Sequence, residues 1–286
     1  MTITHRLIAL AVILIWGINF LFMRLALNEV SPLILGILRF TFVLLPAIFF
    51  FPKPQVSWRW LILYGLTISF GQFAFGFSAL ASGLPTAISA LLMQSQAFFT
   101  VLLAALLLGE PLRKHHFIGM GLAFLGLAIV GIGQFQGVMP LMGVWLALLA
   151  AASWALGNLT VKRIGAVNPV ALVVWGNVSA WVGFVVAALW WHGGEHIMHE
   201  LSALSLKGWG SVLYLSWVSS LLGYGGWGLL LSHYPASKVS PLSLLVPVVA
   251  LLAGYFILRE PLNAWHLVGG SIIMAALCVH VLLGKR

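Results

Sequence analysis

Charged residues are so scarce in this chain that long apolar segments run almost uninterrupted between them. Only 7% of its 286 residues are charged, 62% are hydrophobic, and the mean hydropathy is +1.10. A soluble domain carries about 25% charged residues, whereas a bilayer-spanning helix needs roughly 20 predominantly apolar ones. The sequence therefore predicts an all-α integral membrane protein that consists almost entirely of spanning segments and has no room for a soluble catalytic domain.

Turn residues and charges divide the apolar sequence into ten expected transmembrane helices. Proline stands near the start of several of them, where the first turn of a helix tolerates it. The first segment is too long for a signal peptide and lacks a small-residue cleavage site, so we interpret it as a retained helix. The ten helices are expected near residues 6–27, 32–51, 58–81, 85–108, 117–133, 141–161, 170–191, 209–232, 237–258 and 265–283.

The basic residues are distributed unevenly between the two faces that ten spans define. The net charge is +9, but few basic residues cluster, so we interpret the excess as a topological signal and expect no nucleic-acid partner. Cytoplasmic loops collect lysine and arginine, which predicts that both termini are cytoplasmic. The opposite face carries only Arg24, Lys207 and Arg259. The expected cytoplasmic face carries Arg6, Lys53, Arg59, Arg113, Lys114, Lys162, Arg163, Lys238, Lys285 and Arg286.

The second half of the chain repeats polar features of the first half at a fixed offset. The tripeptide Glu110-Pro111-Leu112 recurs 150 residues later as Glu260-Pro261-Leu262. In the same register, His116 recurs as His266. A polar tripeptide and a histidine that match in one register indicate an internal repeat, because chance matches in so apolar a chain are mostly between apolar residues.

The repeat predicts two homologous halves, residues 1–137 and residues 138–286, with five helices each. Two further pairs match at an offset of 138, namely Trp16 with Trp154 and Arg24 with Lys162. Because five is odd, the second half must enter the membrane from the opposite face, so we expect Glu110 in the cytoplasm and Glu260 outside. Many secondary transporters have such inverted repeats and bind substrate near the midplane between them. A duplicated membrane scaffold without transport is the alternative.

Several short motifs resemble those of the EamA family of the drug/metabolite transporter superfamily. They are residues 16–20 (WGINF), residues 153–158 (SWALGN) and the two Glu-Pro-Leu corners. Residues 64–75 (YGLTISFGQFAF) and 240–249 (SPLSLLVPVV) are similar to the O-acetylserine/cysteine exporter branch. The resemblance covers essentially the whole chain. It implies an inner-membrane exporter of amino acids or related metabolites, with a central cavity lined by the first, third, fourth, sixth, eighth and ninth spans.

Polar and aromatic side chains inside the expected spans are the candidates for a substrate path, because polar groups in hydrocarbon cost energy unless they are paired or hydrated. Neutral amides and hydroxyls suit a zwitterion, and aromatic walls suit an apolar side chain or a cation. Interhelical hydrogen bonds and ordinary packing are the competing explanations. The candidate substrate-binding residues are Trp16, Asn19, Gln72, Gln94, Gln96, Trp154, Asn158, Tyr224, Trp227 and Ser243.

Glycines and prolines in the eighth and ninth spans predict a flexible or locally broken path. Gly225 lies in a cluster of glycines, which permit bending and close backbone approach. Pro241 and Pro247 each remove a backbone donor and can free a carbonyl for a ligand. We take these three residues as candidate hinge or gating positions, with plain small-residue helix packing as the alternative.

The positions of the charged residues bear on whether transport is coupled to protons and on the class of substrate. All acidic residues lie in or next to expected loops, which argues against cationic drug export and carboxylate-based proton antiport and favours facilitated diffusion down a substrate gradient. Arg39 is the one charge deep in a span. We interpret it first as a structural anchor, with contact to a substrate carboxylate as the alternative. Nucleotide sugars, drugs or other metabolites are the alternative substrates, although sugar-phosphate carriers should carry several basic residues mid-span.

An enzyme is not expected, and neither a metal nor a cofactor is expected. Residues 192–196 (HGGEH) match the H-x-x-E-H pattern of some zinc proteases, which needs both histidines on one stable helix. Adjacent glycines disfavour that helix, and we place the stretch in an exposed loop. The single cysteine, Cys278, cannot form an internal disulfide. The expected partners are a small-molecule substrate and the lipid bilayer, and the protein is expected to be a monomer or a homodimer.

Overall fold

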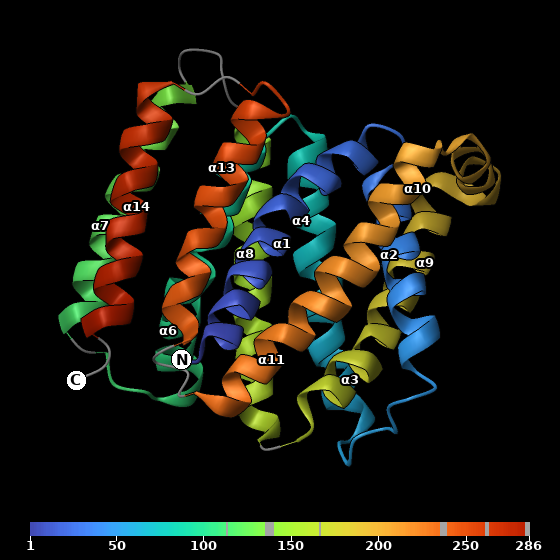
Figure 1. The fold of residues 1–286 in the computed structure, drawn as a ribbon, viewed down its shortest axis with the longest axis horizontal. Coiled ribbons are helices and arrows are strands. Elements are labelled where there is room, and N and C mark those ends of the chain that lie inside the picture. The colour runs from blue at the N-terminus through green and yellow to red at the C-terminus, as the bar shows by residue number, and fades with distance from the viewer. Residues whose placement is uncertain (113, 135–139, 166, 235–238, 261–262, 284–286) are drawn as a thin grey trace.

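Helices are the only regular elements in the part of the chain that the structure describes. The computed structural model shows these helices as one bundle, without a strand among the described residues, which confirms the all-α prediction (Figure 1). The described residues are 1–112, 114–134, 140–165, 167–234, 239–260 and 263–283. Several residues of the repeat and the charge pattern lie outside these ranges, namely Arg113, Lys238, Pro261, Leu262, Lys285 and Arg286.

In the first half, the third and fourth expected spans are each built from more than one helical element. Pro32 opens the second helix at a position where its missing N–H costs nothing. The elements are α1 (Ile3–Leu27), α2 (Pro32–Ala47), α3 (Trp58–Tyr64), the π-helical η1 (Gly65–Gly71), α4 (Gln72–Ala81), α5 (Thr86–Met93), α6 (Gln96–Leu108) and α7 (Lys114–Gln134).

The second half contains the same kinds of element in a similar order. Asn168 caps its longest helix by accepting hydrogen bonds from the amides of Val170 and Ala171. The elements are α8 (Leu141–Ile164), α9 (Pro169–Ala203), α10 (Leu206–Leu213), the π-helical η2 (Tyr214–Leu222), α11 (Gly223–His233), the 3-10 helix η3 (Ser240–Leu245), α13 (Val246–Phe256) and α14 (Ala264–Leu283).

Length and apolarity mark the chain as a multi-pass membrane protein. Five described helices or continuous helical stretches are long and apolar enough to cross a bilayer, namely Ile3–Leu27, Trp58–Ala81, Thr86–Leu108, Leu141–Ile164 and Pro169–Ala203. Shorter apolar helices lie at Pro32–Ala47, His116–Ile129, Leu242–Phe256 and Ala264–Val279. Large apolar side chains such as Leu106, Phe124 and Trp190 stand out from the bundle. Such a surface belongs in lipid, because water would not tolerate so much contiguous apolar area.

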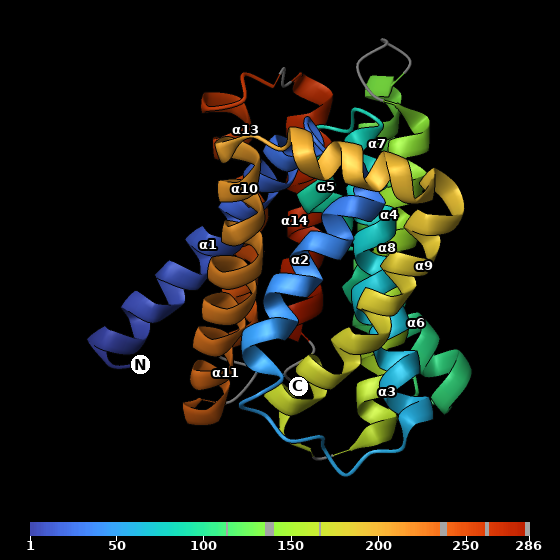
Figure 2. The ribbon, with the colours of Figure 1, turned by 90° about the vertical axis from the view of Figure 1, so that its right-hand side faces the viewer.

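The bundle has two ends that can be followed in Figures 1 and 2. We call the end at which α1 begins the lower end and the opposite one the upper end, as the figures draw them. Helix α14 finishes at the lower end, and the chain passes from α6 to α7 there, whereas α13 ends and α14 begins at the upper end. Helices α7 and α14 pack together at one edge, α2 packs on α9 at the other, and α1 crosses the bundle obliquely (Figures 1 and 2).

Four of the expected spans are interrupted in the interior. Hydropathy predicted none of these interruptions, although the glycines and prolines of the eighth and ninth spans had indicated a flexible or locally broken path in those two. The third and eighth spans contain the π-helical segments η1 and η2. The fourth span breaks at Gln94 and Ser95 between α5 and α6, and the ninth begins as η3 before α13 continues. Wide turns and breaks of this kind often occur at functional sites and in the discontinuous helices of transporters.

Two boundary predictions are corrected by the structure. The second expected span ends at Ala47, and residues 48–51 form a turn. The HGGEH stretch is not a loop, because α9 extends to Ala203 with a kink at Gly193, where φ is +77°. A positive φ is accessible to glycine at little cost, so one glycine breaks the helix and the chain resumes a helix directly afterwards.

Candidate functional site

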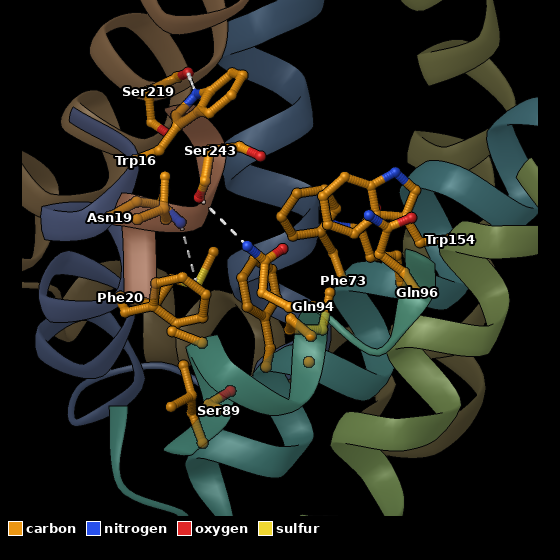
Figure 3. A pocket seen from close by; sticks show the side chains of 18 of the residues that line it. Trp16, Asn19, Phe20, Phe73, Ser89, Gln94, Gln96, Trp154, Ser219 and Ser243 are labelled. Atoms are coloured by element: carbon orange, nitrogen blue, oxygen red, sulfur yellow. Dashed lines mark hydrogen bonds between the residues drawn. The ribbon is translucent and has the colours of Figure 1, made fainter. Parts of the chain in front are cut away.

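A cavity of about 450 Å³ lies among the interior helices. Its walls come from α1, α2, α4, α5, α6, α8, η2, α11, η3 and α13, together with Gln94 at the break between α5 and α6, so both halves of the chain contribute (Figure 3). The lining residues are Trp16, Asn19, Phe20, Met23, Arg39, Gln72, Phe73, Gly76, Phe77, Leu80, Ser89, Ala90, Met93, Gln94, Gln96, Trp154, Asn158, Ser219, Tyr224, Trp227, Ser243 and Val246.

The structure places all ten candidate substrate-binding residues around this one cavity. Their part in binding stays a prediction, but their convergence follows from the rule that polar groups in apolar spans turn away from lipid. Sequence reasoning missed Phe20, Met23 and Ser89, since apolar or small side chains in a span are indistinguishable from core residues. For Arg39, it ranked contact with a substrate carboxylate second, after a structural role.

An aromatic wall joins α1 to the eighth span on one side of the cavity. The indole N–H of Trp16 donates to the backbone oxygen of Ser219 at 3.1 Å (Figure 3). The Trp16 ring also packs against Tyr224 and Trp227, with ring centroids 5.3 Å and 5.2 Å apart respectively. Trp16 reaches this position because Gly223 lacks a side chain, since a Cβ there would lie 2.4 Å from the indole nitrogen.

Amide side chains link the interrupted helices across the cavity. Gln94, at the break in the fourth span, donates from Nε2 to the backbone oxygen of Ser243 at 3.3 Å (Figure 3). Asn158 of α8 donates from Nδ2 to Gln96 Oε1 at 3.0 Å and to Thr100 Oγ1 at 3.2 Å. These bonds connect helices that are far apart in the sequence. Interhelical hydrogen bonding therefore accounts for some, but not all, of the donors and acceptors of these amides.

Arg39 is a buried cation on the cavity wall. Its side chain is 2% exposed, and its Cζ lies 4.2 Å from the centroid of the Phe73 ring. Its Nη2 donates to Ser220 Oγ at 3.1 Å, and its own backbone oxygen accepts a bond from Ser216 Oγ at 3.1 Å. The sequence marked this residue as the one charge deep in a span, and the structure puts that charge beside the cavity.

A network of polar groups lies at the upper end of the bundle. The carboxylate of Glu260 accepts from the Thr86 amide at 3.0 Å and 2.8 Å and from the Thr86 hydroxyl at 2.8 Å. Arg24 lies 3.9 Å from the same carboxylate and donates to the backbone oxygens of Leu80 and Leu84. The carboxylate sits at the N-terminus of α5, where the helix dipole favours a negative charge.

A second ion pair lies at the lower end. Lys162, near the end of α8, pairs with the carboxylate of Glu110, which follows α6. Both side chains are substantially exposed, whereas Arg24 and Glu260 are mostly buried. Each pair therefore joins a residue of the first half to one of the second, at opposite ends of the molecule.

The candidate hinge positions and the HGGEH stretch are not among the described residues that line the cavity. Gly225 is exposed in α11 and Pro247 is buried in α13. Pro241 belongs to η3, and its side chain lies outside the described residues. At the HGGEH stretch, His196 pairs with Glu200 at 2.9 Å, and Glu200 also accepts from the Ser31 amide at 2.7 Å. Among the described residues no group of three or more His, Cys, Asp or Glu side chains is arranged to hold a metal.

A multi-pass helical bundle that encloses a polar and aromatic cavity defines a class of membrane transporters. Residues 5–132 and 141–282 match the EamA-like transporter family, so the chain belongs to the EamA-like transporter family of the drug/metabolite transporter superfamily. This confirms the resemblance drawn from the sequence motifs. The family is one of transporters and not of enzymes.

Relatives and a solved structure cover nearly the whole chain. A protein of Salmonella typhimurium named "Probable amino-acid metabolite efflux pump" is 40% identical over 279 residues, covering 96% of this chain and 93% of the relative. A protein of Escherichia coli with the same name is 39% identical, with the same coverage. One solved crystal structure matches the fold with a TM-score of 0.56 at 20% identity, covering 100% of this chain and 99% of the other.

Proposed function

We propose that this protein exports small amino acids or related metabolites, of the cysteine or O-acetylserine kind, across a bacterial-type inner membrane. The observation that carries the proposal is the cavity, whose lining among the described residues combines neutral amides and hydroxyls, an aromatic wall and a single arginine. Two relatives that are about 40% identical are named probable amino-acid metabolite efflux pumps. A cavity of about 450 Å³ has room for a small amino acid with some water.

Transport by alternating access rests on a ten-helix, 5+5 inverted repeat of residues 1–137 and 138–286. Matched irregularities support that architecture. The π-helical η1 and η2 and the positive φ values of Gly109 and Arg259 recur at the offset of 150 that relates the two Glu-Pro-Leu corners. The glutamates that open those corners lie at opposite ends of the bundle, Glu110 after α6 at the lower end and Glu260 after α13 at the upper end (Figure 1). In this scheme both termini and Glu110 face the cytoplasm, Glu260 faces outside, and the active unit is a monomer or a homodimer.

The absence of acidic side chains from the described cavity lining bears on substrate and coupling. A carboxylate that binds either a proton or a cationic drug is what a proton-coupled drug antiporter needs. The described lining contains none, which supports facilitated diffusion of a neutral or zwitterionic solute. Another solute class, such as a nucleotide sugar, a drug or another metabolite, is the alternative, and a phosphorylated solute would find only Arg39 as a basic group on the described wall.

Counterflow in proteoliposomes tests the proposal. Vesicles containing the full chain are loaded with one unlabelled amino acid, and uptake of the same labelled compound is followed for a panel that includes L-cysteine, O-acetyl-L-serine, L-serine and L-alanine. We expect transient accumulation of at least one of them, which persists when the pH gradient is collapsed. Trp227→Ala, on the cavity wall, should reduce it severalfold, whereas Trp190→Ala, on the lipid-facing surface, should not. Accumulation of a nucleotide sugar but no amino acid would favour the alternative.

A further inference from the structure

The bonding of Arg39 leaves most of its guanidinium unused. Of its three side-chain nitrogens, only Nη2 has a hydrogen-bond partner, Ser220 Oγ, while Nε and Nη1 are buried and have none. Phe73 covers the charge from one side at 4.2 Å. An arginine carries five N–H donors, so the contacts present orient the group without satisfying it.

The described part of the protein supplies no counter-charge for this arginine. The ion pairs among the described residues join other basic groups, namely Arg24, Lys162 and His196, to glutamates. Glu29, the acidic residue nearest to Arg39 in the sequence, accepts hydrogen bonds from the amide and hydroxyl of Ser205 instead. Burying an uncompensated charge is costly. Charged residues inside a membrane often mark a substrate path, so the solute itself is a candidate counter-charge for Arg39.

The other unpaired atom on the cavity wall complements the first. Among the buried polar atoms that lack a partner in the described ranges, those on the cavity lining belong to Arg39 and to Asn19, whose Oδ1 accepts nothing. The Asn19 amide nitrogen contacts only the sulfur of Met23, at 3.6 Å (Figure 3). A cationic donor and an amide acceptor that line the same cavity fit a solute that carries both an anion and a hydrogen-bond donor.

We propose that Arg39 binds the carboxylate of the transported solute, which makes a free carboxylate the feature by which the cavity selects its substrates. The proposal rests on the proposed function and narrows it to amino-acid carboxylates, as opposed to amines, amides or neutral sugars. Arginine matches a carboxylate with two parallel charge-assisted hydrogen bonds. Ser220 and Phe73 hold the guanidinium in place, and Asn19 Oδ1 is available to the ammonium group of the same solute.

The first test changes the solute and leaves the protein intact. Unlabelled L-alanine, L-alaninamide, L-alanine methyl ester and ethylamine compete with the labelled amino acid that gives the strongest counterflow in wild-type vesicles. We expect the free carboxylate to compete at least about tenfold better than the amide or the ester, which keep the ammonium group but lose the anion. Equal competition by acid, amide and ester would show that the free carboxylate does not contribute to recognition. Amino-acid transport itself would still be established by the counterflow.

The second test changes the arginine and keeps a matched control. Arg39→Gln should abolish the preference for acid over amide, and Arg39→Lys should retain part of it, because an ammonium is a point charge without the planar fork. Arg59→Gln removes an equal charge from the exposed surface and should keep the wild-type ratio. The ratio is a readout that simple loss of folded protein does not change. A wild-type ratio in folded Arg39→Gln overturns the proposal, and if neither variant folds, the solute series decides.

A binding measurement separates this inference from the transport function. If wild-type vesicles accumulate no amino acid, the proposed function fails. Thermal stabilisation of the detergent-purified protein by L-alanine and by lactate, compared with L-alaninamide, then decides the carboxylate site. Stabilisation by both carboxylates and not by the amide supports Arg39 as an anion site, whereas no difference between them rejects it.

Discussion

At the scale of single residues, the cavity contains two kinds of polar side chain. Gln94 and Asn158 donate hydrogen bonds to other helices. Arg39 and Asn19 keep buried atoms without a partner. The first kind holds the walls in position, and the second kind is available to a solute, so substitutions in the two groups should differ in whether stability or selectivity suffers most.

Asn158→Ala should act mainly on stability. It removes two interhelical bonds, those to Gln96 and Thr100, and in membranes such bonds are worth about 0.6 kcal/mol each on average. We expect a loss of about 1 kcal/mol, seen as a melting temperature a few degrees lower in detergent. Thr100→Val, which removes only one of these bonds, should have about half the effect. An unchanged melting temperature together with impaired counterflow would instead make Asn158 a substrate contact.

The sequence identified which residues line the cavity better than it identified what they do there. Polar and aromatic residues in apolar spans stand out by composition, which is why Gln72 and Trp154 could be predicted. Whether a polar atom is bonded depends on neighbours far away in the chain. Arg39 meets Ser220 of the other half, and nothing local to α2 contains that information.

At the scale of elements, close backbone contacts accompany the irregular helices. The π-helical η1 begins at Gly65, where a Cβ would lie 1.9 Å from the backbone oxygen of Gly176 on α9. Hydropathy predicted the third span as one continuous helix, because a π-helical segment is as apolar as an α-helical one. The interruption reflects packing against another span, so local sequence could not reveal it.

Gly65→Ala should separate η1 from α9. The added methyl group meets a backbone oxygen, which cannot move as the end of a flexible side chain can. We expect a loss of about 1–3 kcal/mol, the range for an overpacked core, measured by thermal denaturation. Gly225→Ala is the control, since nothing lies within 4 Å of its Cβ position. Equal melting temperatures for the two variants would show that η1 does not depend on this contact.

The hinge hypothesis for the eighth and ninth spans can be tested without disturbing packing at Gly225. Gly225→Ala stiffens α11, because alanine favours the helix by about 1 kcal/mol over glycine. Combined with Pro247→Ala, which restores a backbone donor in α13, it should slow counterflow severalfold while substrate competition stays unchanged. A transport rate and affinity equal to wild type would show that neither position bends during transport.

At the scale of the whole molecule, two ion pairs connect the halves, and in each pair one half supplies the acid and the other supplies the base. Glu110 pairs with Lys162, and Glu260 pairs with Arg24. The sequence matched these residues as two separate repeats, at offsets of 150 and 138. It gave no sign that the matched acid of one half would meet the matched base of the other, because a repeat offset carries no information about contacts between repeats.

The two pairs should differ strongly in their effect on stability. The Glu260 side chain is 12% exposed and accepts hydrogen bonds from both the amide and the hydroxyl of Thr86, whereas the Glu110 side chain is 42% exposed. Removing one partner of a buried pair costs roughly 3–5 kcal/mol, and a surface pair is worth about 0–1 kcal/mol. Glu260→Gln should therefore lower the melting temperature clearly and Glu110→Gln hardly at all. Equal shifts would mean that the buried network at the upper end contributes no more to stability than the exposed pair at the lower end.

The inverted repeat itself predicts that corresponding corners face opposite compartments. In a Cys278→Ser background, Glu110→Cys and Arg259→Cys each place one thiol at an end of the bundle, and both native residues are at least partly exposed. In the proposed arrangement five crossings separate positions 110 and 259, so a membrane-impermeant maleimide added to intact cells should label position 259 and spare position 110. Permeabilising the inner membrane should then expose position 110, while the unsubstituted background controls for other labelling. If both thiols react in intact cells, or neither does, the halves enter the membrane in the same direction, and alternating access between inverted halves has to be abandoned.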